Sequence, residues 1–216
     1  MLRNLNTPNK ITLVRFVFAF LVIIIYSLSF IPSSASFAPQ IGTTGFTWID
    51  LTCAILFILG SITDAIDGHI ARSRNLITDF GKFMDPLADK FLVDASLILL
   101  STKVASNGTF LLFPFITVLF IGRDLAMDGL RMLANSKGRV LAANIYGKIK
   151  TAMEMAIIPI IFLNGFPFSY FSFTGNANWE YTYIVTNILA GITLAMSLIS
   201  CFIYFKQNKD VFEGDK

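Results

Sequence analysis

Apolar residues in this chain gather into six long runs that are separated by short polar segments. The runs predict helices over residues 11–31, 48–71, 83–103, 110–132, 146–163 and 181–205. Each of these runs is long enough to cross about 30 Å of hydrocarbon, for which a helix needs roughly 20 residues. The pattern therefore predicts an all-α integral membrane protein, a six-transmembrane-helix bundle that forms a single domain over residues 1–216.

The composition agrees with a membrane protein. Of 216 residues, 55% are hydrophobic and 14% are charged, and the mean hydropathy is +0.67. Soluble domains carry about 25% charged residues. The net charge of +3 is small and indicates no nucleic-acid partner. Residues 1–10 mix leucines with basic residues, which is typical of a short interfacial segment, although a frayed tail would read the same way.

The positions of the basic residues predict the orientation of the chain. Nearly every Lys and Arg lies in or beside residues 1–10, 72–82, 131–150 and 206–216, and Lys103 is the exception. By the positive-inside rule, we expect a multi-pass protein of the plasma membrane with both termini and the active site on the cytoplasmic side. A cleaved signal peptide is disfavoured, because the first apolar run exceeds the usual core of about 7–15 residues.

Four aspartates flank the polar segment between the second and third runs. Asp64 and Asp67 are three residues apart, and Asp85 and Asp89 are four apart, so each pair shares one helix face. Small residues on the same faces, such as Gly60, are expected to leave room for a ligand. Four carboxylates in a poorly solvated site repel one another unless they are protonated or neutralised by a cation. Oxygen ligands favour Mg²⁺, Mn²⁺ or Ca²⁺, and two such ions about 3.5–4 Å apart form a phosphoryl-transfer clamp.

Other interpretations of these charges are weaker. The aspartates could form interhelical salt bridges, but charges at membrane depth are costly and usually functional. Arg15, one turn into the first run, could extend its side chain to the lipid headgroups.

A second group of charges lies in the fourth and fifth runs. On a helix, Asp124, Asp128 and Arg131 fall within about 60° of one another, which suggests that the acids hold this arginine in place. Arginine binds phosphate with a planar fork of donors and lysine supplies a compact charge. Arg123, Arg131 and Lys148 together could therefore hold a phosphomonoester. The alternative is a basic loop that sets the topology and attracts anionic lipid.

The spacing of residues in the acidic segment resembles a known family signature. It reads D-x2-D-G-x2-A-R-x8-G-x3-D-x3-D from Asp64 to Asp89 and resembles the signature of the CDP-alcohol phosphotransferase family, with every fixed position filled. The Gly-Arg-acid, Gly-Leu-Arg and Gly-Lys-Ile-Lys-Thr segments between residues 122 and 151 resemble the branch that makes phosphatidylglycerol phosphate. Asp124 departs from that branch, where we expect Glu, and the shorter acid would weaken a role that depends on reach.

The resemblance implies an activity and its site. The phosphatidyl group of CDP-diacylglycerol would pass to sn-glycerol 3-phosphate, giving phosphatidylglycerol phosphate and CMP, in a homodimer that uses Mg²⁺ or Mn²⁺, two ions per site. The implied metal ligands are Asp64, Asp67, Asp85 and Asp89, of which Asp89 is also the implied general base. The implied CDP-diacylglycerol site comprises Gly68, Ala71, Arg72 and Gly81, with Asn9 and Thr12 as weaker additions. Arg123, Arg131 and Lys148 would bind the phosphate of the acceptor.

Two other functions stay open at this point. A sibling enzyme could use serine, inositol phosphate or a second phospholipid as acceptor, although serine carries no phosphate for the basic residues to bind. A cation transporter could use the aspartates as an ion path. That path would give no reason for Gly68, Ala71, Arg72 and Gly81 at their spacings, and the chain shows no internal repeat.

Overall fold

The structure, a computed structural model, describes residues 6–41, 46–73, 78–104, 108–138, 145–166 and 182–209, and within its helices it leaves out some side chains, those of residues 67–73 among them. Regular structure in these ranges is helical, apart from two isolated β-bridges. The long helices are α1 (Thr7–Ser27), α3 (Trp48–Ser73), α4 (Asp79–Ser101), α5 (Pro114–Ser136), α6 (Ile145–Phe162) and α7 (Thr182–Gln207). Two short elements, η2 (Leu28–Phe30) and α2 (Ser34–Phe37), follow α1.

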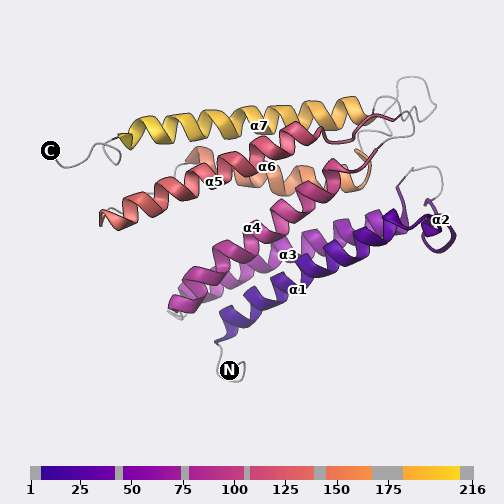
Figure 1. Cartoon of the computed structure of the whole chain (residues 1–216). Coiled ribbons are helices and arrows are strands. Elements are labelled where there is room, and N and C mark those ends of the chain that lie inside the picture. Colours follow the sequence, from indigo (N-terminus) through magenta and orange to yellow (C-terminus); the bar gives the residue numbers. More distant parts are fainter. Residues whose placement is uncertain are drawn as a thin grey trace.

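The long helices form two groups. Helix α1 packs on α3 and α4, while α7 packs on α6 and α5, and the groups meet where α6 contacts α3 and α4 and where α5 contacts α4. Figure 1 shows the groups close together at the end that carries α2 and spread apart at the end where α1 begins and α7 ends. We call these the closed end and the wide end of the bundle.

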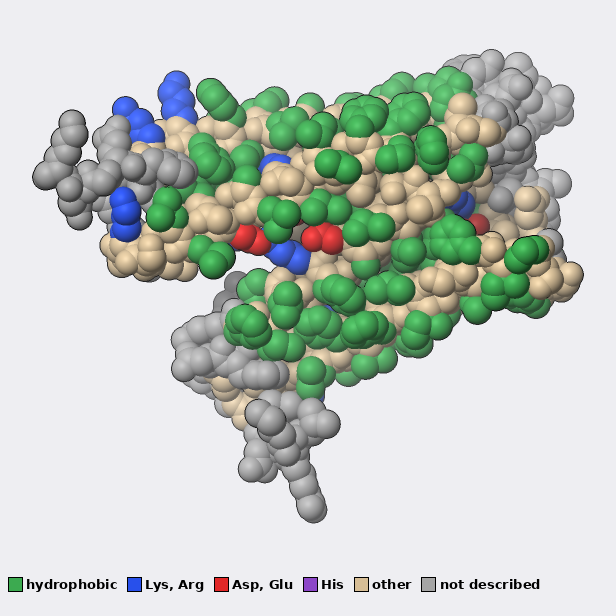
Figure 2. Space-filling model, in the orientation of Figure 1, with side chains coloured by type: hydrophobic (Ala, Val, Ile, Leu, Met, Phe, Trp, Pro, Cys, Tyr) green, Lys and Arg blue, Asp and Glu red, His purple; other side chains and the backbone are tan. Residues whose placement is uncertain are grey.

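Hydrophobic side chains cover much of the helices on the face that Figure 2 shows. Large side chains such as Val17, Ile24, Phe115 and Ile192 are exposed. Soluble proteins rarely expose apolar area on this scale. Helices α1 and α7 contain the segments Asn9–Phe30 and Tyr183–Gln207, each long and apolar enough to cross a bilayer. These features agree with the predicted helical membrane protein.

The first and third long helices begin earlier than the apolar runs suggest. Helix α1 starts at Thr7, so residues 7–10 of the expected interfacial segment belong to it, and residues 1–5 lie outside the described ranges. Helix α4 starts at Asp79, because the Thr78 hydroxyl caps it by accepting a hydrogen bond from the Gly81 amide at 3.0 Å. Pro86 therefore lies inside the helix and not in its first turn.

Helix α5 begins later than expected, at Pro114 instead of residue 110, and runs on to Ser136. Proline suits the first helical turn, where its missing N–H has no intrahelical partner to lose. The residues before it are held by Asn187 of α7, whose side chain accepts from the Phe113 amide at 2.9 Å and donates to the Phe110 carbonyl at 3.0 Å. This tertiary contact explains why the apolar run is longer than the helix.

Gly60 serves helix packing. A Cβ at this position would lie 2.7 Å from Leu92 Cδ2 of α4 and 3.6 Å from Phe18 Cβ of α1. The expectation that Gly60 leaves room for a ligand is therefore wrong, because neighbouring helices fill the space. Ala88, on the face of the second aspartate pair, is also fully buried.

A buried ion pair joins the helices at the closed end. Lys103 Nζ donates to Asp50 Oδ1 at 2.6 Å and to the Phe162 carbonyl at 2.7 Å, which links the start of α3 to the ends of α4 and α6. Asp50 Oδ2 accepts from the Thr47 amide at 2.9 Å. Lys103, the cation that the topology pattern did not explain, therefore has a structural partner.

Candidate active site

A cavity of about 710 Å³ lies between the two helix groups. Its walls come from α3, α4, α5, α6 and α7, and Figure 2 shows acidic and basic side chains in the notch between the groups. Ligand pockets usually measure about 300–1,000 Å³. The cavity is thus large enough for a lipid headgroup or a small phosphorylated alcohol.

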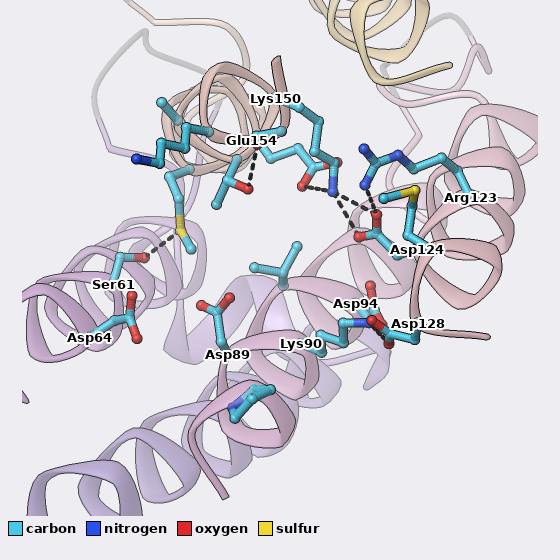
Figure 3. A pocket seen from close by; sticks show the side chains of 18 of the residues that line it. Ser61, Asp64, Asp89, Lys90, Asp94, Arg123, Asp124, Asp128, Lys150 and Glu154 are labelled. Carbon is cyan, nitrogen blue, oxygen red and sulfur yellow. Dashed lines mark hydrogen bonds and ion pairs between the residues drawn. The ribbon is translucent and has the colours of Figure 1, made fainter. Parts of the chain in front are cut away.

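Two of the predicted acids face this cavity. Figure 3 shows Asp64 projecting from α3 and Asp89 from α4. Asp64 Oδ1 lies 2.9 Å from Arg15 Nη1 of α1, and the Arg15 side chain is fully buried. The expectation that Arg15 reaches the headgroups is therefore wrong. A partner inside the bundle compensates the burial of its charge.

Asp89 differs from Asp64 in its bonding. Its Oδ1 atom is buried and has no hydrogen-bond partner in the described part of the chain. A buried polar atom without a partner in a native fold calls for an explanation, and an ion or ligand that binds there is one. Asp89 therefore has a buried oxygen available for an ion or a ligand.

Asp85 belongs to a polar cluster where α1 meets the start of α4. Its Oδ1 accepts from Thr12 Oγ1 at 2.5 Å. Asn9 Nδ2 donates to Thr78 Oγ1 at 3.0 Å. A Cβ on Gly81 would lie 2.9 Å from Asn9 Oδ1, so only glycine fits without a shift. The predicted residues Asn9, Thr12 and Gly81 therefore belong to the same polar cluster as Asp85.

Part of the predicted site lies outside the described residues. The side chains of Asp67, Ala71 and Arg72, and the surroundings of Gly68, are not described, although all four belong to α3. Among the side chains that the structure does describe, no three acids, histidines or cysteines come together as a metal-ligand set. The four-aspartate metal site and the CDP-diacylglycerol pocket stay predictions.

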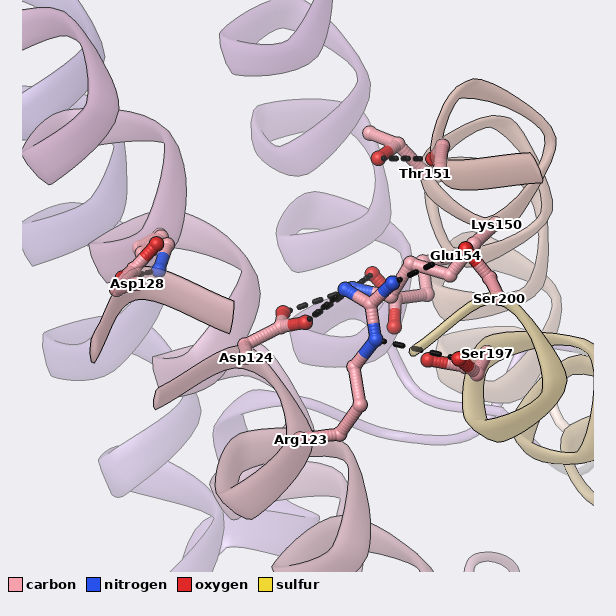
Figure 4. A network of polar contacts seen from close by, with 10 residues as sticks. Arg123, Asp124, Asp128, Lys150, Thr151, Glu154, Ser197 and Ser200 are labelled. Carbon is pink, nitrogen blue, oxygen red and sulfur yellow. Dashed lines mark hydrogen bonds and ion pairs between the residues drawn. The ribbon is translucent and has the colours of Figure 1, made fainter. Parts of the chain in front are cut away.

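On the opposite wall Arg123 is held by several contacts, which Figure 4 shows. Its Nη1 donates to Asp124 Oδ1 at 2.8 Å, its Nε to the Ser197 carbonyl at 3.3 Å and its Nη2 to Ser200 Oγ at 3.4 Å. Each of its three nitrogens is engaged, so Arg123 fixes Asp124 and joins α5 to α7.

Lys150 and Glu154 of α6 complete this wall. Lys150 Nζ lies 2.9 and 2.7 Å from the two oxygens of Asp124 and 2.5 Å from Glu154 Oε2. Both residues are buried and line the cavity, and neither was among the predicted site residues. Their four-residue spacing within an apolar run was the available signal, because a Lys–Glu pair at that spacing shares a helix face.

Arg131 and Lys148 are exposed cations that line the cavity. The acids expected to hold Arg131 are occupied elsewhere, since Asp124 binds Arg123 and Lys150, and Asp128 pairs with Lys90 of α4. That expectation is therefore wrong. The helical wheel places the residues on one face correctly but cannot show which cations the neighbouring helices bring to them.

Comparison with known proteins agrees with the family resemblance that the acidic motif indicates. Residues 5–205 match the family model of the CDP-alcohol phosphatidyltransferases. A CDP-diacylglycerol–glycerol-3-phosphate 3-phosphatidyltransferase of Bacillus subtilis (strain 168) is 35% identical over 204 residues, 94% of this chain and 95% of that protein. A protein of the same name from Mycoplasma pneumoniae is 35% identical over 93% of this chain and 86% of its own length.

A cardiolipin synthase (CMP-forming) of Oryza sativa subsp. japonica is 38% identical over 124 residues, 53% of this chain and 37% of that protein. The family model covers nearly the whole chain, and the acidic motif lies within it. The chain therefore belongs to the CDP-alcohol phosphatidyltransferase family.

Proposed function

We propose that this protein transfers the phosphatidyl group of CDP-diacylglycerol to sn-glycerol 3-phosphate, forming phosphatidylglycerol phosphate and CMP. The observation that carries the proposal is a single cavity with carboxylates on one wall and exposed cations beside it. Relatives named for this reaction, which are 35% identical over almost the whole chain, support it.

In this proposal the acids bind divalent cations and accept a proton. Asp64, Asp67, Asp85 and Asp89 would hold two Mg²⁺ or Mn²⁺ ions, and the unpartnered oxygen of Asp89 beside Asp64 suits oxygen-ligated metals. Bound metal would supply positive charge to the diphosphate and the departing CMP. Asp89 takes the proton from the attacking hydroxyl as general base.

The substrates are bound by different parts of the site. Gly68, Ala71, Arg72 and Gly81, with Asn9 and Thr12 nearby, would take the nucleotide end of CDP-diacylglycerol. Arg131 and Lys148, whose exposed side chains can reach a ligand in the cavity, would bind the phosphate of the acceptor. Arg123, also predicted for that role, lines the same cavity, but its nitrogens are engaged within the protein, so it would contribute charge and rigidity.

We further propose that all six long helices cross the plasma membrane with the wide end of the bundle at the cytoplasmic face. The concentration of basic residues in the segments at that end supports this orientation. The acyl chains of the lipid substrate would stay in the bilayer beside the apolar outer surface. A homodimer is proposed on the family resemblance alone.

The decisive experiment measures CMP release by the purified protein from CDP-diacylglycerol with sn-glycerol 3-phosphate, serine, inositol phosphate or phosphatidylglycerol as acceptor. We expect release with glycerol phosphate only, loss of activity in EDTA, and recovery on adding Mg²⁺ or Mn²⁺. Release with another acceptor but not with glycerol phosphate would identify a sibling enzyme. Cation flux in liposomes without any CMP release would indicate a transporter.

A further inference from the structure

Glu154 is a buried acid in the cavity wall with no role in the reaction proposed so far. It is 3% exposed and lines the cavity, and Figure 3 shows its carboxylate among the side chains there. Its Oε2 lies 2.5 Å from Lys150 Nζ, whereas Oε1 is buried without a hydrogen-bond partner in the described residues. A buried acceptor left unsatisfied is destabilising, so a donor that reaches Oε1 gains free energy.

The charges around Glu154 limit what that donor can be. Lys150 lies between Asp124 and Glu154, and Arg123 binds Asp124, so two cations balance two carboxylates. Figure 4 shows this network. A carboxylate oxygen accepts hydrogen bonds, donates none and repels the oxygens of phosphate groups. Oε1 therefore suits a neutral donor such as an alcohol hydroxyl.

The proposed acceptor carries one hydroxyl that has no partner. Its primary hydroxyl attacks the phosphatidyl phosphorus and gives its proton to Asp89, and its phosphate binds Arg131 and Lys148. The secondary hydroxyl lies between these two ends of the molecule. Glu154 comes from α6 and Asp89 from α4, so the two acids line different walls of one cavity. An acceptor that spans this cavity would present its middle carbon to the wall that carries Glu154.

We propose that Glu154 Oε1 accepts a hydrogen bond from the secondary hydroxyl of the acceptor and makes the site specific for a glycerol phosphate. This inference rests on the proposed function. Lys150 holds the carboxylate in place by binding its other oxygen. An acceptor without the secondary hydroxyl leaves Oε1 unpaired, and sites built for a hydroxyl reject such analogues most strongly.

The test compares two acceptor substrates in the wild-type protein and in variants of α6. 3-Hydroxypropyl phosphate keeps the primary hydroxyl and the phosphate of sn-glycerol 3-phosphate but lacks the secondary hydroxyl. We expect the wild-type protein to prefer glycerol phosphate by about 10- to 100-fold in kcat/KM, the range of a hydrogen bond to a charged group. Glu154→Leu should lose this preference by slowing glycerol phosphate alone. Glu154→Gln keeps an oxygen acceptor and should retain most of the preference.

Ala156→Leu, an exposed change on the same helix, is the control and should behave as wild type. Equal slowing of both acceptors by Glu154→Leu would mean that Glu154 is structural and would overturn the inference. Equal use of both acceptors by the wild-type protein would overturn it too, whether or not the variants fold. Failure of the wild-type protein to use glycerol phosphate at all would instead overturn the proposed function.

Discussion

Buried charges occur at the closed end of this helix bundle and also around the cavity between its helix groups, and the two sets of charges differ in what they can still bind. At the closed end, Lys103 bonds Asp50 and the Phe162 carbonyl, and Asp50 uses its second oxygen for the Thr47 amide. At the cavity, Asp89 and Glu154 each keep one buried oxygen without a partner in the described chain.

The comparison teaches that burial alone does not mark a functional charge. A buried ion pair whose hydrogen bonds are complete within the protein has no donor or acceptor left for a ligand. Such a pair affects the free energy of unfolding instead. A buried carboxylate oxygen that lies beside a cavity and has no partner can still accept a hydrogen bond or bind a cation. The predictions below test this distinction, beginning with the largest effect.

Asp89→Asn should lower kcat by about 10³-fold, because the amide cannot take the proton from the attacking hydroxyl. CDP-diacylglycerol binding should stay largely intact, because the side chain keeps its shape. CMP release measures the first quantity and equilibrium binding the second. Ser101→Ala, at the other end of the same helix, is the control. Wild-type turnover by the asparagine variant would refute the assignment of Asp89 as base.

Lys103→Met should lower the free energy of unfolding by about 3–5 kcal/mol, because it leaves the buried carboxylate of Asp50 without its cation. The kcat of the folded fraction should not change. Reversible unfolding in micelles and CMP release measure the two quantities. Adding Asp50→Leu to the variant should recover much of the loss. A large drop in kcat with unchanged stability would contradict the distinction between the closed end and the cavity.

Arg15→Met should weaken metal binding by about 10- to 100-fold, the usual effect of losing a residue that orients a metal ligand. The reason is that Arg15 holds Asp64 at 2.9 Å from within the bundle. Mn²⁺ binding followed by electron paramagnetic resonance reports this without any turnover. Lys10→Met, an exposed change on the same helix, should leave binding unaffected. Unchanged Mn²⁺ affinity in the Arg15 variant would show that Asp64 needs no such support.

Arg131→Ala should raise KM for glycerol phosphate by about 10-fold, because it removes one charge-assisted contact to the acceptor phosphate. The KM for CDP-diacylglycerol should change little. Steady-state kinetics with each substrate varied in turn separates the two. Lys137→Ala, also exposed and near the end of α5, is the matched control. An equal effect of both substitutions would indicate a general attraction of anions to this surface.

Most of the fold could be predicted from the sequence. Six apolar runs correspond to six long helices in the described residues, because an apolar run of that length leaves the backbone no alternative to internal hydrogen bonding in a bilayer. The helix ends were less predictable. Thr78 extends α4 at its start, while Asn187 holds the residues before Pro114 out of α5. Helix caps and tertiary hydrogen bonds of this kind depend on single atoms, and the spacing of apolar residues along the chain does not reveal them.

The sequence by itself determined the family, through the spacing of its acidic motif. The spacing from Asp64 to Asp89 is local information, because these residues lie in one short stretch of the sequence. Only the tertiary structure decided which charges pair, as with Arg15 and Asp64 or Lys150 and Asp124. These partners are 49 and 26 residues apart in the sequence, so their meeting depends on how whole helices pack. The same packing left Glu154 in the cavity wall with one buried oxygen that has no partner in the described residues, which no pattern along the chain could reveal.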